Sequence, residues 1–488
     1  MKLLIIYFKL FFAAAFLLVS STIVFADDVP NIGSPHSKYL SPQQEAEIGR
    51  QMMQRVREST ALITDPEINS YIQSIGNRLV NSSEDNNLPQ FTFFIIASNQ
   101  INAFAAPGGY IGLFTGLINA TKTESELAAV IAHEIGHITQ KHIARRIAEQ
   151  ERLSVPRIAA LLASILIATQ DSEAGAAAMI STNAASIQHQ LSYSRTAEKE
   201  ADNVGLKLLA KTGYNPNGMT DFFETLQDEH SLSGKPIEYL STHPLTTNRI
   251  SEIKARINPN FKWQGKDSSN YSLIKTKLDI NQITDPDIAL KKYEQLVLKN
   301  NNFQNRYGYA LALIKSEKYS KAEKIALQLI KDDAERIAYI IALGKSQLKQ
   351  SKFEQCYKTY KKGFSIYPEN YPLIHHYAVA LLYSKSYSQG LEFIKQRLNI
   401  ARSYPSLFKL AADLASKDNK EWLAHEYMGD YYLFNFNQPG LAREHYRKSI
   451  TNAHNSLKSL QVKEILLSRI ESKIEKINKL EQEIKNNQ

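Results

Sequence analysis

The most informative hydrophobic pattern of the chain lies between residues 123 and 142. Apolar side chains recur at three- and four-residue steps, as along one face of a helix, at Leu127, Val130, Ile131, Ile135 and Ile138. Thr123 and Glu126 stand just before this stripe with the spacing of a capping box. We therefore expect a helix that begins just before Leu127.

Similar signals predict further helices in the first half of the chain. Residues 41–56 carry a second capping box, formed by Ser41 and Gln44, with a proline at the first helical position. Another helix is expected to start at Asp65, which also precedes a proline. A further helical pattern covers residues 192–209.

The same half contains signals for a small sheet. Residues 90–98 are rich in β-branched and aromatic side chains and predict a strand. The turn sequence Pro107-Gly108-Gly109, between short apolar runs, predicts a hairpin. The apolar segment 158–168 is too short to span a bilayer, so it is either a buried or lid helix or a membrane-touching one. These elements indicate a mixed α+β domain that is mostly helical.

The second half of the chain repeats itself every 34 residues. Small residues occupy two series of positions in this phase: Ala310, Gly344, Ala378 and Ala412, and twelve residues later Ala322, Cys356, Gly390 and Ala424. Small side chains at such positions let the two helices of a hairpin approach closely. The period resembles that of tetratricopeptide repeats and predicts an all-α solenoid; an irregular helical domain is the alternative.

Composition and charge narrow the class of protein. The 488 residues are too many for one core, so at least two domains are expected. The net charge of +9 is not concentrated in a basic patch interleaved with aromatic residues, which argues against nucleic-acid binding. The single cysteine, Cys356, excludes an internal disulfide.

The first 26 residues have the layout of a signal peptide. Lys2 and Lys9 form a positive region, an apolar run begins at Leu10, and small residues end at Ala26. Cleavage there predicts an exported chain, and an exported chain without disulfides fits a bacterial periplasm. An uncleaved N-terminal anchor is the alternative.

These signals divide the chain into five expected segments. They are a signal peptide (1–26), an α+β domain that carries the candidate chemistry described below (27–265), a polar linker (266–284), the repeat domain (285–455) and a tail (456–488). Isoleucine and leucine recur in the tail at three- and four-residue steps, which predicts a helix that caps the solenoid; a short coiled-coil contact is the alternative.

The candidate chemistry lies on the first helix described above. His133 and His137 are one turn apart on one face, so both imidazoles can reach one zinc ion at about 2.0–2.1 Å. Glu134 is rotated by about 100° from His133, beside the metal and not onto it. From there it can take a proton from water at the metal and return it to the leaving amine.

A catalytic zinc ion needs a third protein ligand. Glu198 is the candidate, and Asp202, four residues later on the same helical face, can accept a hydrogen bond from a ligand imidazole. Glu200 is expected to point elsewhere and stay solvated. Taken without the first motif, residues 192–209 are better interpreted as a surface helix whose charges form i,i+4 pairs.

These motifs resemble those of known peptidases. HEIGH at residues 133–137 with ExxAD at residues 198–202 resembles the gluzincin-type zinc peptidases related to the CAAX prenyl proteases. With the N-terminal signal, NAFAAPGG (102–109), STHPLTTNRI (241–250) and the repeats, nearly the whole chain is similar to the periplasmic beta-barrel assembly-enhancing proteases. Membrane-embedded relatives carry several long apolar spans, which are absent from this sequence after residue 26.

The resemblance implies a function. It implies one zinc ion per chain, degradation of stalled or misassembled outer-membrane β-barrel proteins, and help in their assembly. It also implies that the repeats bind the assembly machinery or its clients, and that residues 102–109 supply an edge strand for an extended substrate. A repeat-based chaperone or scaffold without proteolysis is the alternative. Peripheral contact with a membrane is also compatible with the sequence.

Three further residues have open roles. His243 lies in a proline-containing turn; it either stabilises that turn or approaches the metal, as a resting fourth ligand or as a donor to the oxyanion. Arg249 either serves the oxyanion or anchors the turn. His142 is expected beside the ligands or in solvent, not on the metal. A lid formed by residues 158–186 would make activity conditional.

Overall fold

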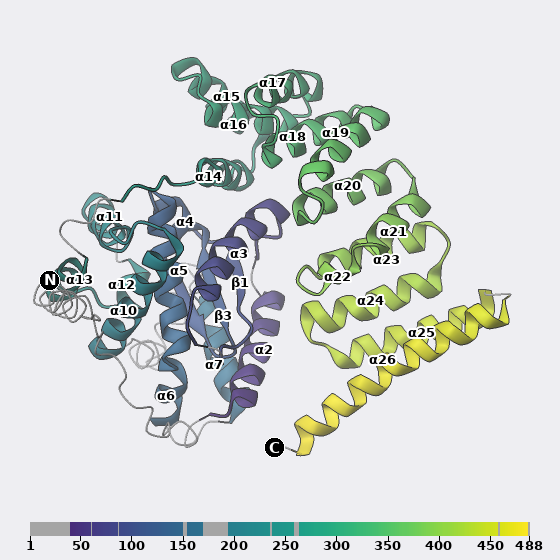
Figure 1. Ribbon diagram of the computed structural model, residues 1–488, viewed down its shortest axis with the longest axis horizontal. Helices are drawn as coiled ribbons and strands as arrows, with labels where there is room; N and C mark the ends of the chain where they lie inside the picture. The colour runs from purple at the N-terminus through teal and green to yellow at the C-terminus, as the bar shows by residue number, and fades with distance from the viewer. Residues whose placement is uncertain are drawn as a thin grey trace, which may run out of the picture.

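The computed structural model of this chain describes residues 40–59, 61–85, 87–149, 154–168, 194–234, 237–257, 263–456 and 459–486. The expected signal peptide and most of the expected lid lie outside these residues. Among the described helices, none is both long and apolar enough to cross a membrane. Figure 1 shows two parts: an N-terminal part built around a small sheet, and a curved row of helices beside it.

A three-stranded sheet lies at the centre of the N-terminal part. β1 (Thr92–Ile96) is parallel to β3 (Tyr110–Phe114), and β2 (Ala103–Ala106) is antiparallel to β3, which gives the order β1–β3–β2. The tight turn between β2 and β3 needs Gly108 and Gly109, whose φ angles are +78° and +87°. The strand and the hairpin expected from the sequence are both present, and β2 forms one edge of the sheet.

Helices cover both faces of this sheet. They are α2 (Pro42–Ser59), α3 (Pro66–Asn81), α5 (Glu124–Thr139) and α7 (Val155–Ala168). Phe93 and Ile95 of β1 share one core with α3 and α5, whereas Phe94 and Ile96 share a second core with α2 and α7. This division follows from the strand period of two, which sends alternate side chains to opposite faces.

The helix starts follow the expected caps. Asp65 accepts hydrogen bonds from the backbone of Glu67 and Ile68, and Thr123 accepts one from the backbone of Glu126. Ser41 and Gln44 make both bonds of a capping box. The apolar segment that contains Ile158 forms a helix that packs against α2. This agrees with its interpretation as a buried helix.

Further helices complete the N-terminal part. They are α4 (Thr115–Ala120), α6 (His142–Glu149), α10 (Arg195–Thr212), α11 (Gly218–Ser233), α12 (Glu238–Thr242) and α13 (Thr247–Arg256). α10 and α11 pack on α5 on the side away from α2, as seen in Figure 1. The helix that carries the candidate chemistry is therefore buried between the sheet and α10.

The C-terminal part is a row of antiparallel helices. They are α15 (Pro286–Lys299), α16 (Phe303–Lys315), α17 (Tyr319–Asp332), α18 (Ile337–Lys349), α19 (Phe353–Ile366), α20 (Tyr371–Tyr383), α21 (Tyr387–Lys395), α22 (Leu398–Ala401), α23 (Ser406–Lys417), α24 (Glu421–Phe436), α25 (Pro439–Ser456) and α26 (Leu460–Asn486). All eight in-phase small residues are buried in the pairs α16–α17, α18–α19, α20–α21 and α23–α24. A Cβ on Gly344 would come within 2.4 Å of the Tyr360 ring, which explains the need for a small residue there.

The prediction of a linker at residues 266–284 is wrong. Residues Ser269–Gln282 form a helix, α14, which packs against α3, α4 and α16. Its polar composition hides an apolar face, since Tyr271, Ile274 and Leu278 are buried in the peptidase-side core. The two parts are therefore joined by a packed helix.

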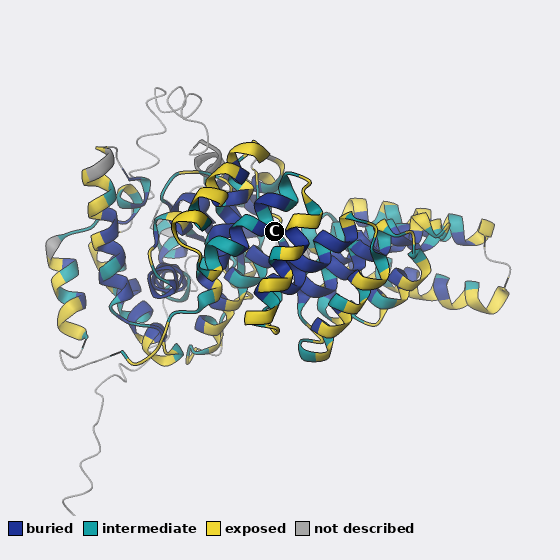
Figure 2. Ribbon diagram, turned by 90° about the horizontal axis from the view of Figure 1, so that it is seen from above, coloured by how far each residue is buried: buried dark blue, intermediate teal, exposed yellow. Residues whose placement is uncertain are grey.

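The row of helices curves around the N-terminal part. α14 and α20 contact α3, and the Arg57 guanidinium of α2 lies 5.8 Å from the centre of the Phe436 ring on α24. Figure 1 shows α14 to α24 arranged along the side of α2 and α3. In Figure 2, buried residues run through the interior of both parts, and exposed residues lie mainly on the outer sides of the helices.

Candidate metal centre

Close packing of α5 against α10 brings the two sequence motifs together. A Cβ on Gly136 of α5 would come within 2.8 Å of the Ala201 carbonyl oxygen on α10, so only glycine allows this approach. His133 and His137 of α5 then face Glu198 and Asp202 of α10, and all four side chains are buried. The structure thus brings together the ligands expected from the sequence.

Four side chains direct one nitrogen or oxygen atom each to a common point. They are His133, His137, Glu198 and His243, and their candidate ligand atoms all lie within 4.8 Å of one another. His133 Nε2 is 3.0 Å from His137 Nε2 and 3.3 Å from His243 Nδ1; Glu198 Oε1 is 3.4 Å from His137 Nε2 and 3.0 Å from His243 Nδ1. Four ligands placed tetrahedrally at zinc bond lengths would be separated by about 3.3–3.4 Å.

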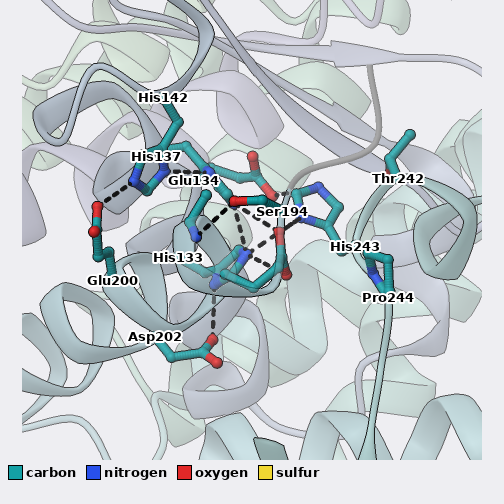
Figure 3. A network of polar contacts seen from close by, with 12 residues as sticks. His133, Glu134, His137, His142, Ser194, Glu200, Asp202, Thr242, His243 and Pro244 are labelled. Carbon is teal, nitrogen blue, oxygen red and sulfur yellow. Dashed lines mark hydrogen bonds and ion pairs between the residues drawn. The ribbon is translucent and has the colours of Figure 1, made fainter. Parts of the chain in front are cut away.

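Hydrogen bonds to the outer ring nitrogens fix the state of the two α5 histidines (Figure 3). His133 Nδ1 lies 2.9 Å from Asp202 Oδ1, and His137 Nδ1 lies 2.8 Å from His142 Nδ1. His142 Nε2 lies 2.9 Å from Glu200 Oε2. A carboxylate only accepts, so His133 donates through Nδ1, and His142 donates to Glu200 and accepts from His137.

The consequence for His137 is that Nδ1 carries the proton and Nε2 carries the lone pair. Burial lowers the pKa of His137 well below its ordinary value and also lowers the pKa of His142, so the rings of His137 and His142 are neutral at pH 7. The Nε2 atoms of His133 and His137 lie 3.0 Å apart, close enough for one cation to bind both. The donor set of imidazole and carboxylate is the one zinc prefers, so the residues fit a divalent metal.

Glu134 lies beside this point without being part of the ligand group. Its side chain is fully buried, and within the described residues neither carboxylate oxygen has a hydrogen-bond partner. His243 Nε2 lies 3.5 Å from Glu134 Oε1. Burial raises the pKa of Glu134, so this carboxyl group binds a proton more readily than an exposed glutamate does.

Arg249 holds the carboxylates of α10. Its Nε and Nη2 atoms donate to Asp202 over 2.6 and 2.8 Å, and its Nη1 atom pairs with Glu198 and donates to the Pro244 carbonyl. Although burial alone would raise it, hydrogen bonds from Arg249 and His133 hold the pKa of Asp202 below its usual value. Of the two roles left open for Arg249, these contacts support anchoring of the turn and of the carboxylates.

Glu200 points away from the ligand group as expected, but the expectation that it is simply solvated is wrong. Its carboxylate is partly buried and pairs with His142 and with Arg145, the latter over 2.9 Å. The reason is that the helix is interrupted after α5. Lys141 has φ +54°, and a new helix begins at His142. Treated as one continuous helix, the sequence places His142 on another face; the break turns it back toward His137.

His243 follows the short helix α12. Its ring stacks on Tyr239 with 4.5 Å between ring centroids, and its side chain is 1% exposed. Although burial opposes it, the charges of Glu198 and Glu134 raise the pKa of His243. The structure therefore places His243 beside the candidate metal ligands. A role in stabilising the turn alone would not require this position.

Comparisons with known proteins agree with this geometry. Residues 66–257 match the family described as Peptidase family M48. The chain is 39% identical over 321 residues to a putative beta-barrel assembly-enhancing protease of Vibrio cholerae, with 65% of this chain and 66% of that protein covered. It is 34% identical over 332 residues to the beta-barrel assembly-enhancing protease of Yersinia pestis, covering 67% and 68%. For the protein of that name in Escherichia coli K12 the identity is 33% over 347 residues, covering 69% and 70%.

Proposed function

Because the chain belongs to the family of beta-barrel assembly-enhancing proteases, with a domain of peptidase family M48, we propose that it is a periplasmic zinc endopeptidase that degrades misassembled outer-membrane β-barrel proteins and assists their assembly. Its membership of the family makes it a metalloprotease. The choice of zinc, the periplasmic location and the identity of the partners are parts of the proposal. The alignments span about two thirds of the relatives' length, so their activity is carried over as a proposal.

One observation carries the proposal: two imidazole nitrogens of α5 and the buried Glu198 carboxylate converge beside Glu134, which is not needed as a ligand. We assign His133, His137 and Glu198 as metal ligands and Asp202 as the group that fixes the His133 tautomer. A bound zinc ion would polarise the scissile carbonyl and lower the pKa of the attacking water. Glu134 would accept a proton from that water and deliver it to the leaving amine.

The position of His243 suggests a state without substrate. Its Nδ1 atom lies with the three proposed ligands, so His243 would hold the fourth corner of the metal at rest. A catalytic zinc ion needs that corner open. Movement of the turn between α12 and α13 would open it, and the imidazole would then be a candidate donor to the oxyanion.

The sheet offers a place for an extended substrate. β2 (Ala103–Ala106) is an edge strand that packs against α5, the helix of His133 and His137. A polypeptide paired with β2 would be held by main-chain hydrogen bonds, which do not read side chains. This mode suits an enzyme that accepts many unfolded clients.

The test is degradation of an unfolded outer-membrane β-barrel protein by the purified chain. We expect cleavage that stops on chelation and returns with zinc, and no cleavage by the Glu134→Gln variant. A chain that prevents aggregation of the client but never cleaves it, with zinc present, would support the scaffold alternative. Zinc-loaded wild type that neither cleaves nor binds the client would overturn both functions.

A further inference from the structure

A second cluster of buried charges lies where the row of helices meets α3. Lys277 of α14 is 3% exposed; its ammonium group lies 2.9 Å from Asp65 Oδ2 and is also hydrogen-bonded to Glu67. His376 Nε2 of α20 lies 3.3 Å from Glu67 Oε1. Asp65 caps α3 and Glu67 lies in its first turn, so the N-terminus of this helix lies between α14 and α20.

The groups around these two acids come from successive helices of the row. Lys277 lies on α14, Tyr307 on α16, Lys345 on α18 and His376 on α20, and these helices contact one another in this order. Burial, followed by the charges of Glu67 and Asp65, raises the pKa of Tyr307 well above its ordinary value. The inner side of the row thus presents two ammonium groups, a phenol and an imidazole to two carboxylates.

The cluster is not saturated by the two acids. Lys345 has no ion-pair partner within 4.0 Å and the buried hydroxyl of Tyr360 has no hydrogen-bond partner, both counted within the residues that the structure describes. Burial and the charge of Lys277 lower the pKa of Lys345, while the charges of Glu67 and Asp65 oppose this shift. A buried hydroxyl normally has a hydrogen-bond partner, so Tyr360 can donate to a further acceptor, and the half-buried ammonium group of Lys345 can pair with one.

We propose that the inner side of this row is a binding surface for acidic polypeptide segments, and that the Asp65-Pro66-Glu67 turn occupies it within the same chain. A partner segment with two or more closely spaced carboxylates would compete for Lys277 and Lys345 and displace the turn. This inference deepens the proposed role of the repeats in partner binding, but it uses no residue of the metal centre.

Displacement of the turn would affect the peptidase domain. Ile68, Ile72 and Ile75 of α3 lie in one core with Leu127 and Ile131 of α5, the helix that carries the metal-binding histidines. A change at the start of α3 therefore reaches α5 through directly packed side chains. Binding of an acidic partner to the repeats is thereby coupled to the active-site helix.

The experiment measures binding of a labelled peptide to the full chain by fluorescence anisotropy. The probe is ALITDPEINS, the sequence of residues 61–70, blocked at both ends; the control peptide carries amides in place of its two carboxylates. The proteins are the wild type and the Asp65→Asn/Glu67→Gln variant. Asparagine still caps α3 and both changes are isosteric, so the Asp65-Pro66-Glu67 turn, which competes with the peptide, loses only its charge.

We expect the acidic peptide to bind the double variant at least tenfold more tightly than the wild type, and the control peptide to bind neither. Adding Lys345→Met to the double variant should weaken binding of the acidic peptide at least tenfold. Equal binding of the two peptides, or equal affinity of the double variant and the wild type, would overturn the proposal.

A second measurement covers the case in which the double variant does not fold. Hydrogen exchange of the wild type is followed with the acidic or the control peptide at millimolar concentration. We expect faster exchange of the α3 backbone amides from Ile68 onward with the acidic peptide only, because the turn that caps them is displaced. Identical exchange with both peptides, at a concentration where the acidic one is bound, would contradict displacement.

Discussion

His142 accepts a hydrogen bond from the Nδ1 atom of His137 over 2.8 Å, and this contact leaves the Nε2 atom of His137 facing the candidate metal ligands. The His142 ring also donates to Glu200, which Arg145 holds in place. Asp202 plays the matching part for His133. Both imidazoles of α5 therefore have a partner on their outer ring nitrogen.

Replacement of His142 by alanine should weaken metal binding. Loss of such an outer partner typically lowers metal affinity by roughly 10–100-fold. Competition with a chromogenic chelator measures the zinc dissociation constant directly. His142→Asn is the matched control, since its amide oxygen can still accept from His137 Nδ1. Equal zinc affinity for the alanine variant and the wild type would mean that His142 does not position His137.

Arg249→Met should destabilise the metal-free chain more than the metal-loaded one. Without zinc, the buried carboxylates of Glu198 and Asp202 depend on the guanidinium, and removing one partner of a buried ion pair costs about 3–5 kcal/mol. Bound metal would neutralise Glu198 and reduce this loss. Denaturant unfolding with and without zinc gives both free energies.

The control for Arg249 is Lys199→Met, which breaks an exposed pair with Glu252. Such a pair contributes about 0–1 kcal/mol. An Arg249 variant no less stable than this control, in the absence of metal, would contradict the assigned role.

Gly136→Ala should push α10 away from α5. The added Cβ would meet the Ala201 carbonyl oxygen at 2.8 Å, and overpacking of this kind costs about 1–3 kcal/mol. Since Glu198 and Asp202 lie on α10, zinc affinity should fall as well. Gly440→Ala on α25 is the control, because a Cβ there meets no atom within 4 Å. A Gly136 variant with unchanged stability and zinc affinity would show that the close approach is dispensable.

Zinc should raise the thermal stability of the chain. A ligand that binds only the folded state at 1,000 times its dissociation constant adds about 4 kcal/mol. Calorimetry after dialysis against a chelator, then with added zinc, measures the change. His137→Ala should show no zinc-dependent rise; a rise of the same size in that variant would place the metal elsewhere.

The sequence predicts the elements whose signals are local. The helix from Glu124, the β2–β3 hairpin and the caps at Asp65 and Thr123 follow from spacing and turn chemistry over a few residues. The proposed ligand set follows from two motifs because a helix places residues four apart on one face. The 34-residue phase also corresponds to buried small residues in paired helices, although their assignment as tetratricopeptide repeats stays a prediction.

The failures come from tertiary contacts. Residues 266–284 are polar enough to suggest a linker, yet Tyr271 and Leu278 are buried in the core. Lys277 is also buried, and it is paired with the carboxylate of Asp65 at the start of α3. The role of Glu200 depends on the break at Lys141, since no pattern marks a positive φ angle at a lysine. The partners of Arg249 are 47 and 51 residues away in the chain, beyond any local pattern.

The most direct test of the metal centre is elemental analysis of the purified wild type and the Glu134→Gln variant, each assayed for cleavage of an unfolded outer-membrane β-barrel protein. We expect one zinc ion per chain in both proteins and cleavage only by the wild type, because Glu134 is needed for proton transfer and not for binding the metal. A wild type that binds no metal even when supplied with zinc, or a Glu134→Gln variant that cleaves at the wild-type rate, would contradict this assignment.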